Sequence, residues 1–175
     1  MQMIARTAIF HNIESYVIDD KVRKLQECEN YGFVKEYSYE LAEGLNLVED
    51  FCNEVSHRAD CDEQGYFMLV INSLEVFRKI CADKSQSKRI SDIIKNGEGN
   101  RIFIVFAAAD NQPVGFNSSE IMKTIKEERQ AILFNTLNES KVFDISGRIK
   151  VDTSFDNGMA YRFSGSTYRK IKLFD

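Results

Sequence analysis

Short, uninterrupted runs of apolar residues alternate along this chain with longer segments in which apolar residues recur at helical spacing. A continuous run of three to five apolar residues is typical of a strand that is covered on both faces. Strands that alternate with helical segments predict an α/β fold with a mainly parallel sheet and crossover helices. The expected strands are 16–18, 67–71, 102–106 and 131–134.

Three segments between these runs carry apolar residues three and four positions apart, as on one face of a helix. The predicted helices cover 41–55, 74–94 with a break in the stripe after 81, and 121–125, and a further helix is expected within 1–11. Asn96-Gly97 is a stop signal for the second helix, and Ser118 and Ser119 suit the cap of the third.

The C-terminal segment has a different pattern, in which apolar and other residues alternate over 159–163. Ser164-Gly165-Ser166 then turns the chain toward a second alternating stretch, which predicts a β-hairpin appended to the α/β core. There is no internal repeat and no composition shift that marks a boundary. We therefore expect residues 1–175 to form a single domain.

Charge and cysteine content exclude several classes of function. The chain has 23 Lys and Arg against 27 Asp and Glu, a net charge of −4, which does not favour nucleic acid or anionic lipid. Its longest apolar stretch, 102–109, is far shorter than a membrane span, so no direct membrane contact is expected. The four cysteines form no CxxC pair, which argues against zinc and for reduced thiols, although one disulfide stays open.

Motifs that would bind a nucleotide or a metal are absent or incomplete. None of the nine glycines is followed by lysine, so the chain has no P-loop. Gly97 and Gly99 precede a strand rather than follow one, which indicates a turn and not a dinucleotide fingerprint. Asp19 and Asp20 close the first strand and could hold magnesium or act as a base. A turn at the strand end is the favoured interpretation of this pair.

Six segments in order resemble the motor domains of the FtsK/SpoIIIE ATPase family. The similarity is greatest to the C-terminal degenerate ATPase domain of EssC-type coupling proteins in type VII secretion. The matching segments are YVIDD (16–20), VEDFCNEVSHR (48–58), FMLVINSLEVF (67–77), NRIFIVFAAADNQPVGF (100–116), KEERQAILFNTLNESKVFDI (126–145) and DNGMAYRF (156–163). The resemblance implies a RecA-like, P-loop NTPase-like sheet flanked by helices. It also implies that residue 1 lies within the helix that would follow the P-loop.

Departures from the family pattern predict the loss of catalysis. Asp19 matches the strand that ends in Asp, but Asn72 and Ser73 stand where magnesium binding and water activation require Asp and then Glu. Ala108 replaces a polar sensor of the γ-phosphate, and Arg129 is the remaining family arginine, for which a structural salt bridge is expected. We expect neither ATP nor magnesium to bind. At the strand end, Asn72→Asp is expected to be tolerated, whereas Ile71→Asp is expected to unfold the domain.

The resemblance leads to a hypothesis for function. It implies a non-catalytic domain of a type VII secretion motor, cytoplasmic and part of a longer membrane-anchored protein that has ATPase activity elsewhere and can oligomerise. Its expected partners are small helical secreted proteins and other domains of the motor, with Leu137, Val142 and Phe143 as candidate contacts. These three residues could equally start a core strand. The alternatives are an active ATPase whose P-loop lies upstream, and an unrelated α/β protein.

Overall fold

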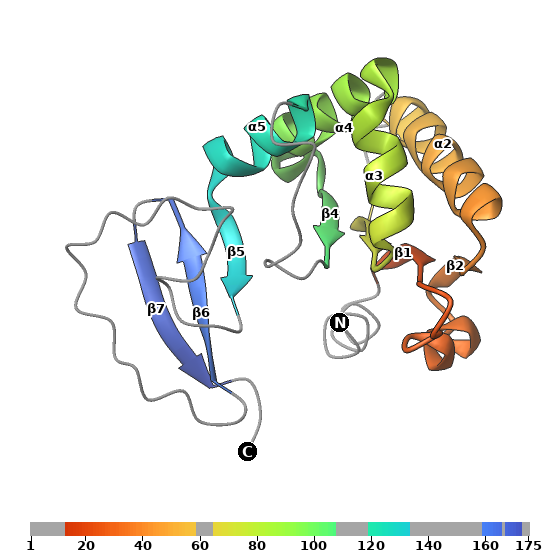
Figure 1. Cartoon of the computed structure of the whole chain (residues 1–175), viewed down its shortest axis with the longest axis horizontal. Helices are drawn as coiled ribbons and strands as arrows, with labels where there is room; N and C mark the ends of the chain where they lie inside the picture. Colours follow the sequence, from red (N-terminus) through yellow and green to blue (C-terminus); the bar gives the residue numbers. More distant parts are fainter. Residues whose placement is uncertain (1–12, 59–64, 108–118, 134–158, 166, 173–175) are drawn as a thin grey trace.

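The structure is a computed structural model that describes residues 13–58, 65–107, 119–133, 159–165 and 167–172. Within these ranges the chain forms a four-stranded sheet, a layer of helices and a separate three-stranded sheet (Figure 1). The elements are β1 Glu14–Ile18, η1 Gln26–Asn30, β2 Val34–Ser38, α2 Leu41–Arg58, β3 Phe67–Ile71, α3 Leu74–Ala82, α4 Lys84–Gly97, η2 Glu98–Asn100, β4 Ile102–Phe106, α5 Glu120–Glu128, β5 Gln130–Leu133, β6 Met159–Ser164 and β7 Thr167–Lys172.

The larger sheet has the strand order β2-β1-β3-β4, and every neighbouring pair is parallel. Its centre is β3, whose five residues are all buried. Ile18 of β1 and Phe106 of β4 both lie opposite Ile71 of β3, so the strands end at one common edge. This alignment places the residues that follow β1 and β3 next to each other.

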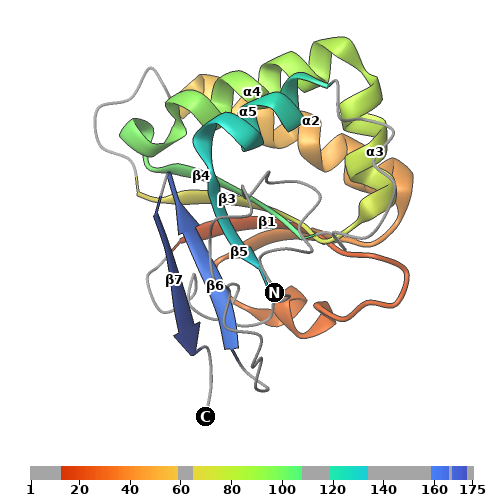
Figure 2. The same cartoon turned by 60° about the vertical axis from the view of Figure 1, so that its left-hand side comes forward.

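Helices α2 to α5 cover one face of the parallel sheet, as Figure 2 shows. On this face the core contains Phe51 stacked on Phe67, with ring centroids 4.9 Å apart. The opposite face of the described sheet packs against the segment around η1, where Leu25 and Cys28 are buried with Val17. Burial on both faces explains why β1 and β3 have no alternation of apolar and polar residues.

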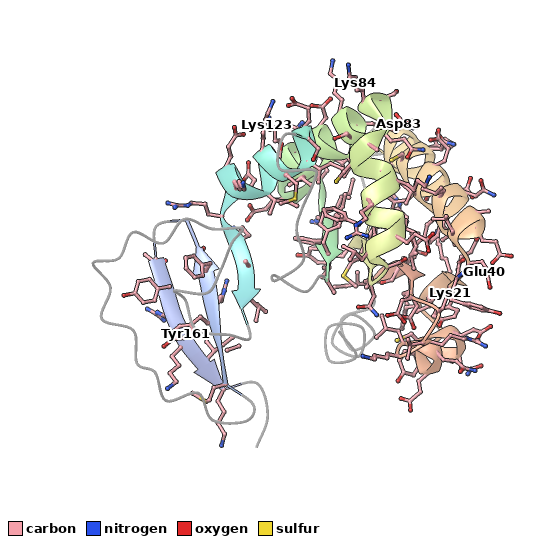
Figure 3. All side chains as sticks on the ribbon, viewed as in Figure 1. Lys21, Glu40, Asp83, Lys84, Lys123 and Tyr161 are labelled. Atoms are coloured by element: carbon pink, nitrogen blue, oxygen red, sulfur yellow. The ribbon has the colours of Figure 1, made fainter. Side chains whose placement is uncertain are left out.

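The smaller sheet is antiparallel, with the order β5-β6-β7. A turn through Gly165, whose φ of 60° suits glycine, connects β6 to β7. Tyr161 of β6 (Figure 3) packs edge-on against Tyr168 of β7 at 6.4 Å between ring centroids. The C-terminal β-hairpin predicted from the sequence is therefore confirmed.

The structure confirms most predicted elements and corrects three details. The strands at 67–71 and 102–106, the cap of α5 at Ser119 and the end of α4 at Gly97 are as expected. The segment 131–134 was expected in the parallel sheet, but β5 is antiparallel and belongs to the smaller sheet. Strand β2 was not predicted, and the stripe over 74–94 is two helices that meet at Asp83 (Figure 3). The predicted helix within 1–11 lies outside the described residues.

Candidate functional site at the strand ends

Asp19 is the polar centre of the edge where β1 and β3 end. Only 1% of its surface is exposed, and its carboxylate accepts four hydrogen bonds. The donors are the amide of Asp20 at 2.9 Å, the amide of Leu25 at 2.6 Å, the Tyr37 hydroxyl at 3.1 Å and the Asn72 amide at 2.7 Å. These bonds satisfy a carboxylate that would be costly to bury alone.

The turn that follows β1 is organised by Asp19 together with its neighbour. The Asp20 side chain accepts a hydrogen bond from the amide of Val22 at 2.9 Å, and the Asp20 carbonyl accepts one from the amide of Arg23 at 2.9 Å. The favoured interpretation of the Asp19-Asp20 pair, a turn at the strand end, agrees with this geometry. Lys21, in the same turn, is labelled in Figure 3.

Asn72 and Ser73 follow β3, and both are engaged in local structure. The Asn72 backbone amide donates to the carbonyl of Ile18 at 2.7 Å and its side chain donates to Asp19. Ser73 is the N-cap of α3, with its hydroxyl accepting from the amide of Val76 at 3.4 Å. Asn72 and Ser73 therefore link β3 to β1 and begin a helix.

Tyr37 joins this cluster from β2, the strand that was not predicted from the sequence. Burial raises the pKa of Tyr37 to about 12, with the charge of Asp19 acting in the same direction and Arg23 in the opposite one. The Arg23 guanidinium lies 4.2 Å from the centre of the Tyr39 ring. The strand ends therefore carry a series of contacts that runs from the Asp19 carboxylate to the phenol of Tyr37, then to the Arg23 guanidinium and finally to the ring of Tyr39.

Of the predicted residues that the structure describes, Asp19 and Asn72 are brought together by a hydrogen bond between their side chains. Arg129 is the left-handed residue that ends α5, with φ of 50°. No carboxylate of the described ranges forms a salt bridge with it, so the structural salt bridge expected for Arg129 stays a prediction. Ala108, Leu137, Val142 and Phe143 lie outside the described residues.

Tyr37, Leu25 and Arg23 are the members of the cluster that sequence reasoning missed. Tyr37 lies in a strand whose sequence, VKEYS, carries two charged residues, and its burial pattern shows an edge strand with one well-buried residue. Leu25 contributes its backbone amide, which no sequence motif marks. The apolar residues of this strand, Val34 and Tyr37, are three positions apart, so the segment shows no alternation that would have predicted a strand.

The described residues contain no group of three or more His, Cys, Asp or Glu side chains placed to hold a metal ion. At the end of β3, the described side chains offer an amide and a hydroxyl rather than carboxylates. The carboxylate that lies nearby, Asp19, already accepts four hydrogen bonds. What this arrangement does chemically is to fasten two strand ends together.

The parallel sheet, its helical layer and the appended antiparallel sheet together form a RecA-like fold. Among solved structures, the fold is that of the ATPase domains of type VII secretion motors. EssC (ATPases 2 and 3) from Geobacillus thermodenitrificans matches 98% of this chain with a TM-score of 0.69 and 19% identity. The cytoplasmic domain of EssC matches 98% with a TM-score of 0.67 and 20% identity.

A third solved structure is EccC (ATPases 2 and 3) from Thermomonospora curvata in complex with a signal sequence peptide. It matches 93% of this chain and 31% of its own length, with a TM-score of 0.64 and 13% identity. The chain spans 34% and 33% of the two EssC structures, so it corresponds to about a third of each. No family model matches the chain, and no curated protein matches it.

None of the described helices is both long and apolar enough to cross a lipid bilayer.

Proposed function

We propose that this chain acts as a non-catalytic, ATPase-like domain of a type VII secretion motor and contributes to secreted-substrate recognition or to regulation. The single observation that supports the non-catalytic part is the bond between Asn72 and Asp19 at the ends of β3 and β1. A P-loop NTPase needs a carboxylate at the end of this strand to hold magnesium and an activated water. Here the position carries an amide that is already bonded within the protein.

The fold supports placing the domain in the cytosolic part of a membrane-associated secretion complex. Its solved neighbours include the cytoplasmic domains of EssC and EccC, and a further EccC structure holds a signal sequence peptide. By analogy, the partners of this chain are small helical secreted proteins and other domains of the same motor. Oligomerisation of a full-length motor belongs to the same proposal.

Contact with such partners is proposed to be apolar rather than ionic. The net charge of −4 offers little attraction for acidic ligands, and exposed ion pairs contribute little at physiological salt. On the described surface, Tyr66 and Phe103 are 45% and 37% exposed and stack at 5.9 Å between centroids. Exposed aromatic pairs of this kind are common anchors in protein interfaces.

Calorimetric titration with magnesium-ATP tests the non-catalytic part. We expect no saturable heat, because neither a P-loop nor a strand-end carboxylate is available. Saturable binding with a micromolar dissociation constant would overturn it and support the alternative of a nucleotide-binding motor domain. Asp19→Asn is a useful comparison, because it removes the buried carboxylate that is bonded to Asn72 and should leave the baseline unchanged.

Capture of a small secreted protein encoded beside the gene tests the recognition part. Binding is expected to persist in high salt and to weaken about tenfold when Tyr66→Ala or Phe143→Ala removes an apolar contact. Lys84→Ala, a change on the exposed start of α4, is the matched control and should have no effect. Binding that collapses in salt and ignores both aromatic substitutions would contradict the proposal.

A further inference from the structure

The three-stranded sheet formed by β5, β6 and β7 (Figure 1) is strongly basic. Its strands contain four Lys or Arg residues and no Asp or Glu. Because the whole chain has 23 Lys and Arg, 19 of them lie elsewhere, together with all 27 Asp and Glu. The sheet therefore has a local excess of positive charge in a protein whose net charge is −4.

Two of the four basic residues lie directly opposite each other in the sheet. The pairing of β6 with β7 places Arg162 opposite Arg169, and the pairing of β5 with β6 places Ile132 on the other side of Arg162. Successive side chains of a strand point to opposite faces, so residues that are paired in register share a face. Ile132, Arg162 and Arg169 therefore form one row across the sheet, which we call the arginine row.

The other face of the sheet carries aromatic residues and is the more buried one. Tyr168 packs against Tyr161 at 6.4 Å and against Phe163 at 6.0 Å between ring centroids. Tyr161 and Phe163 are 4% and 6% exposed. In the arginine row, by contrast, both arginines are exposed and Ile132 is 41% exposed. The arginine row is therefore accessible from solvent.

The arginine row separates a covered part of its face from an open part. Two positions along the strands on one side of the row, Ala160 is buried and Ile171 is partly buried. On the other side, toward the turn at Gly165, Gln130 and Thr167 are exposed. A ligand of the two guanidinium groups would therefore meet aliphatic side chains next to them.

The two arginines do not stabilise the hairpin by their charge. Like charges placed directly opposite each other destabilise an antiparallel strand pair. Within the described ranges, neither Arg162 nor Arg169 forms a salt bridge with a carboxylate. Each guanidinium presents N–H donors in a planar fork that matches a carboxylate. The pair is therefore better suited to receiving an anion than to holding the strands together.

We propose that Arg162 and Arg169 together bind one carboxylate of an acidic polypeptide segment from outside this chain. Both guanidinium groups would donate hydrogen bonds to that carboxylate, and an aliphatic neighbour of the acidic residue would pack on Ile132. The inference goes beyond the proposed function, which concerns apolar contact, and does not depend on it.

A polypeptide carboxylate fits this surface better than an extended polyanion does. Nucleic acids and anionic membranes present many negative charges, and the rest of this chain, which holds all of its Asp and Glu, repels them. A single carboxylate requires only the local charge of the arginine row. The exposed side chain of Ile132 also offers aliphatic contact, which a polypeptide uses and a bare phosphate group does not.

A short peptide with one glutamate between two isoleucines is a suitable probe. The peptide is acetylated and amidated, so that the glutamate is its only charge, and a matched peptide has glutamine in that place. NMR titration of the whole chain follows the side-chain Nε–Hε signals of Arg162 and Arg169. We expect saturable shifts of both signals, and we expect the glutamine peptide to bind at least about fivefold more weakly.

Substitutions at Arg169 separate the guanidinium fork from charge alone. Arg169→Lys keeps the charge without the fork, so the glutamate peptide should bind at least about threefold more weakly. Arg169→Gln should abolish saturable binding and raise the melting temperature by about 1–2 °C at low salt, because it removes the repulsion. Lys172→Gln changes the net charge equally on the other face of β7 and should leave binding unchanged.

Several results would overturn the proposal. One is the absence of saturable shifts, and another is equal binding of the two peptides or equal loss in Arg169→Gln and Lys172→Gln. A lower melting temperature for Arg169→Gln would show that Arg169 already pairs with a carboxylate of this chain. Inorganic phosphate that saturates the same shifts at a lower concentration than the peptide would assign the arginine row to a phosphate ligand. Shifts that follow protein concentration without peptide, together with a dimer in sedimentation, would assign it to a second copy.

Discussion

The side-chain amide of Asn72 donates a hydrogen bond to Asp19 Oδ1 at 2.7 Å, although 53 positions separate the two residues in sequence. The bond joins the ends of β1 and β3, which are neighbours in the parallel sheet. In doubly wound folds this edge is the usual place for a ligand. Here the two side chains satisfy each other and hold the strand ends together.

Asn72→Asp is expected to destabilise the protein at neutral pH, contrary to the tolerance expected from the sequence. The change would place two carboxylates within hydrogen-bond distance, and Asp19 is 1% exposed. We expect a loss of about 2–3 kcal/mol in the free energy of unfolding at pH 7. Urea denaturation followed by circular dichroism measures the loss.

The pH dependence of Asn72→Asp has a defined sign. Two adjacent carboxylates retain a proton in the folded state that they release when the chain unfolds, so the native state binds more protons. The stability of the variant should therefore fall as pH rises from about 4.5 to 7, relative to the unchanged protein. Asn72→Ala is the control, since it removes the bond without adding a charge. A loss independent of pH would contradict the explanation.

Asp19→Ala is expected to cost more than Asp19→Asn. The alanine variant leaves the buried amide of Leu25 and the side chain of Asn72 without acceptors, and we expect a loss of about 3–4 kcal/mol. Asparagine keeps the shape and one carbonyl acceptor, so about half of that loss is expected. Chemical denaturation of the two variants provides the comparison. Equal stability of the two variants would show that shape, rather than acceptor chemistry, is what matters at this position.

Much of the larger sheet could be predicted because its two central strands, β1 and β3, are buried on both faces and because β4 is a continuous apolar run. Phe67–Ile71 and Ile102–Phe106 are continuous apolar runs, and the structure gives the same bounds. The edge strand Val34–Ser38 was missed because it carries two charged residues and one buried position, a pattern that a loop also shows. Apolar patterning reports burial, so strands with little burial leave little signal.

The candidate site was predictable only in part. Asp19 and Asn72 follow apolar runs, and parallel topology brings such positions together, so their proximity was implied by the strand assignment. The contributions of Tyr37 and the amide of Leu25 depend on the course of the turn and on β2, neither of which has a motif. The left-handed backbone of Arg129 at the end of α5 was not predicted, because a helix end that is not glycine or asparagine carries no sequence signal for it.

Gly97→Ala is expected to destabilise the protein, whereas Gly99→Ala is expected to have little effect. An added Cβ at Gly97 would lie 2.5 Å from the carbonyl oxygen of Ile102, and a backbone atom cannot move away as a side chain can. At Gly99 the same atom would meet nothing within 4 Å. We expect a loss of about 2 kcal/mol for the first variant and less than about 0.5 for the second. Thermal melts of the pair measure the difference.

An unchanged melting temperature for Gly97→Ala would contradict the close approach of α4 to β4. Gly44→Ala offers an intermediate case, since the added Cβ would lie 3.0 Å and 3.1 Å from methyl groups of Ile18 and Val76. Side-chain methyls can shift by a few tenths of an ångström, so a smaller loss is expected there.

Tyr37→Phe is expected to make stability less sensitive to alkaline pH. Burial raises the pKa of Tyr37 to about 12, so the native state keeps a phenolic proton that the unfolded chain releases near pH 10. The native state then binds more protons, and stability falls as pH rises from about 10 through 12. Tyr37→Phe removes this proton from the balance and should flatten the fall in stability with pH, although loss of the 3.1 Å bond to Asp19 costs about 1 kcal/mol at pH 7.

Urea denaturation at pH 7 and at several pH values above 9 measures both effects of Tyr37→Phe. Tyr168→Phe, at an exposed position of β7, is the matched control and should keep the original slope. Parallel pH profiles for Tyr37→Phe and the unchanged protein would show that the proton on Tyr37 is not coupled to folding.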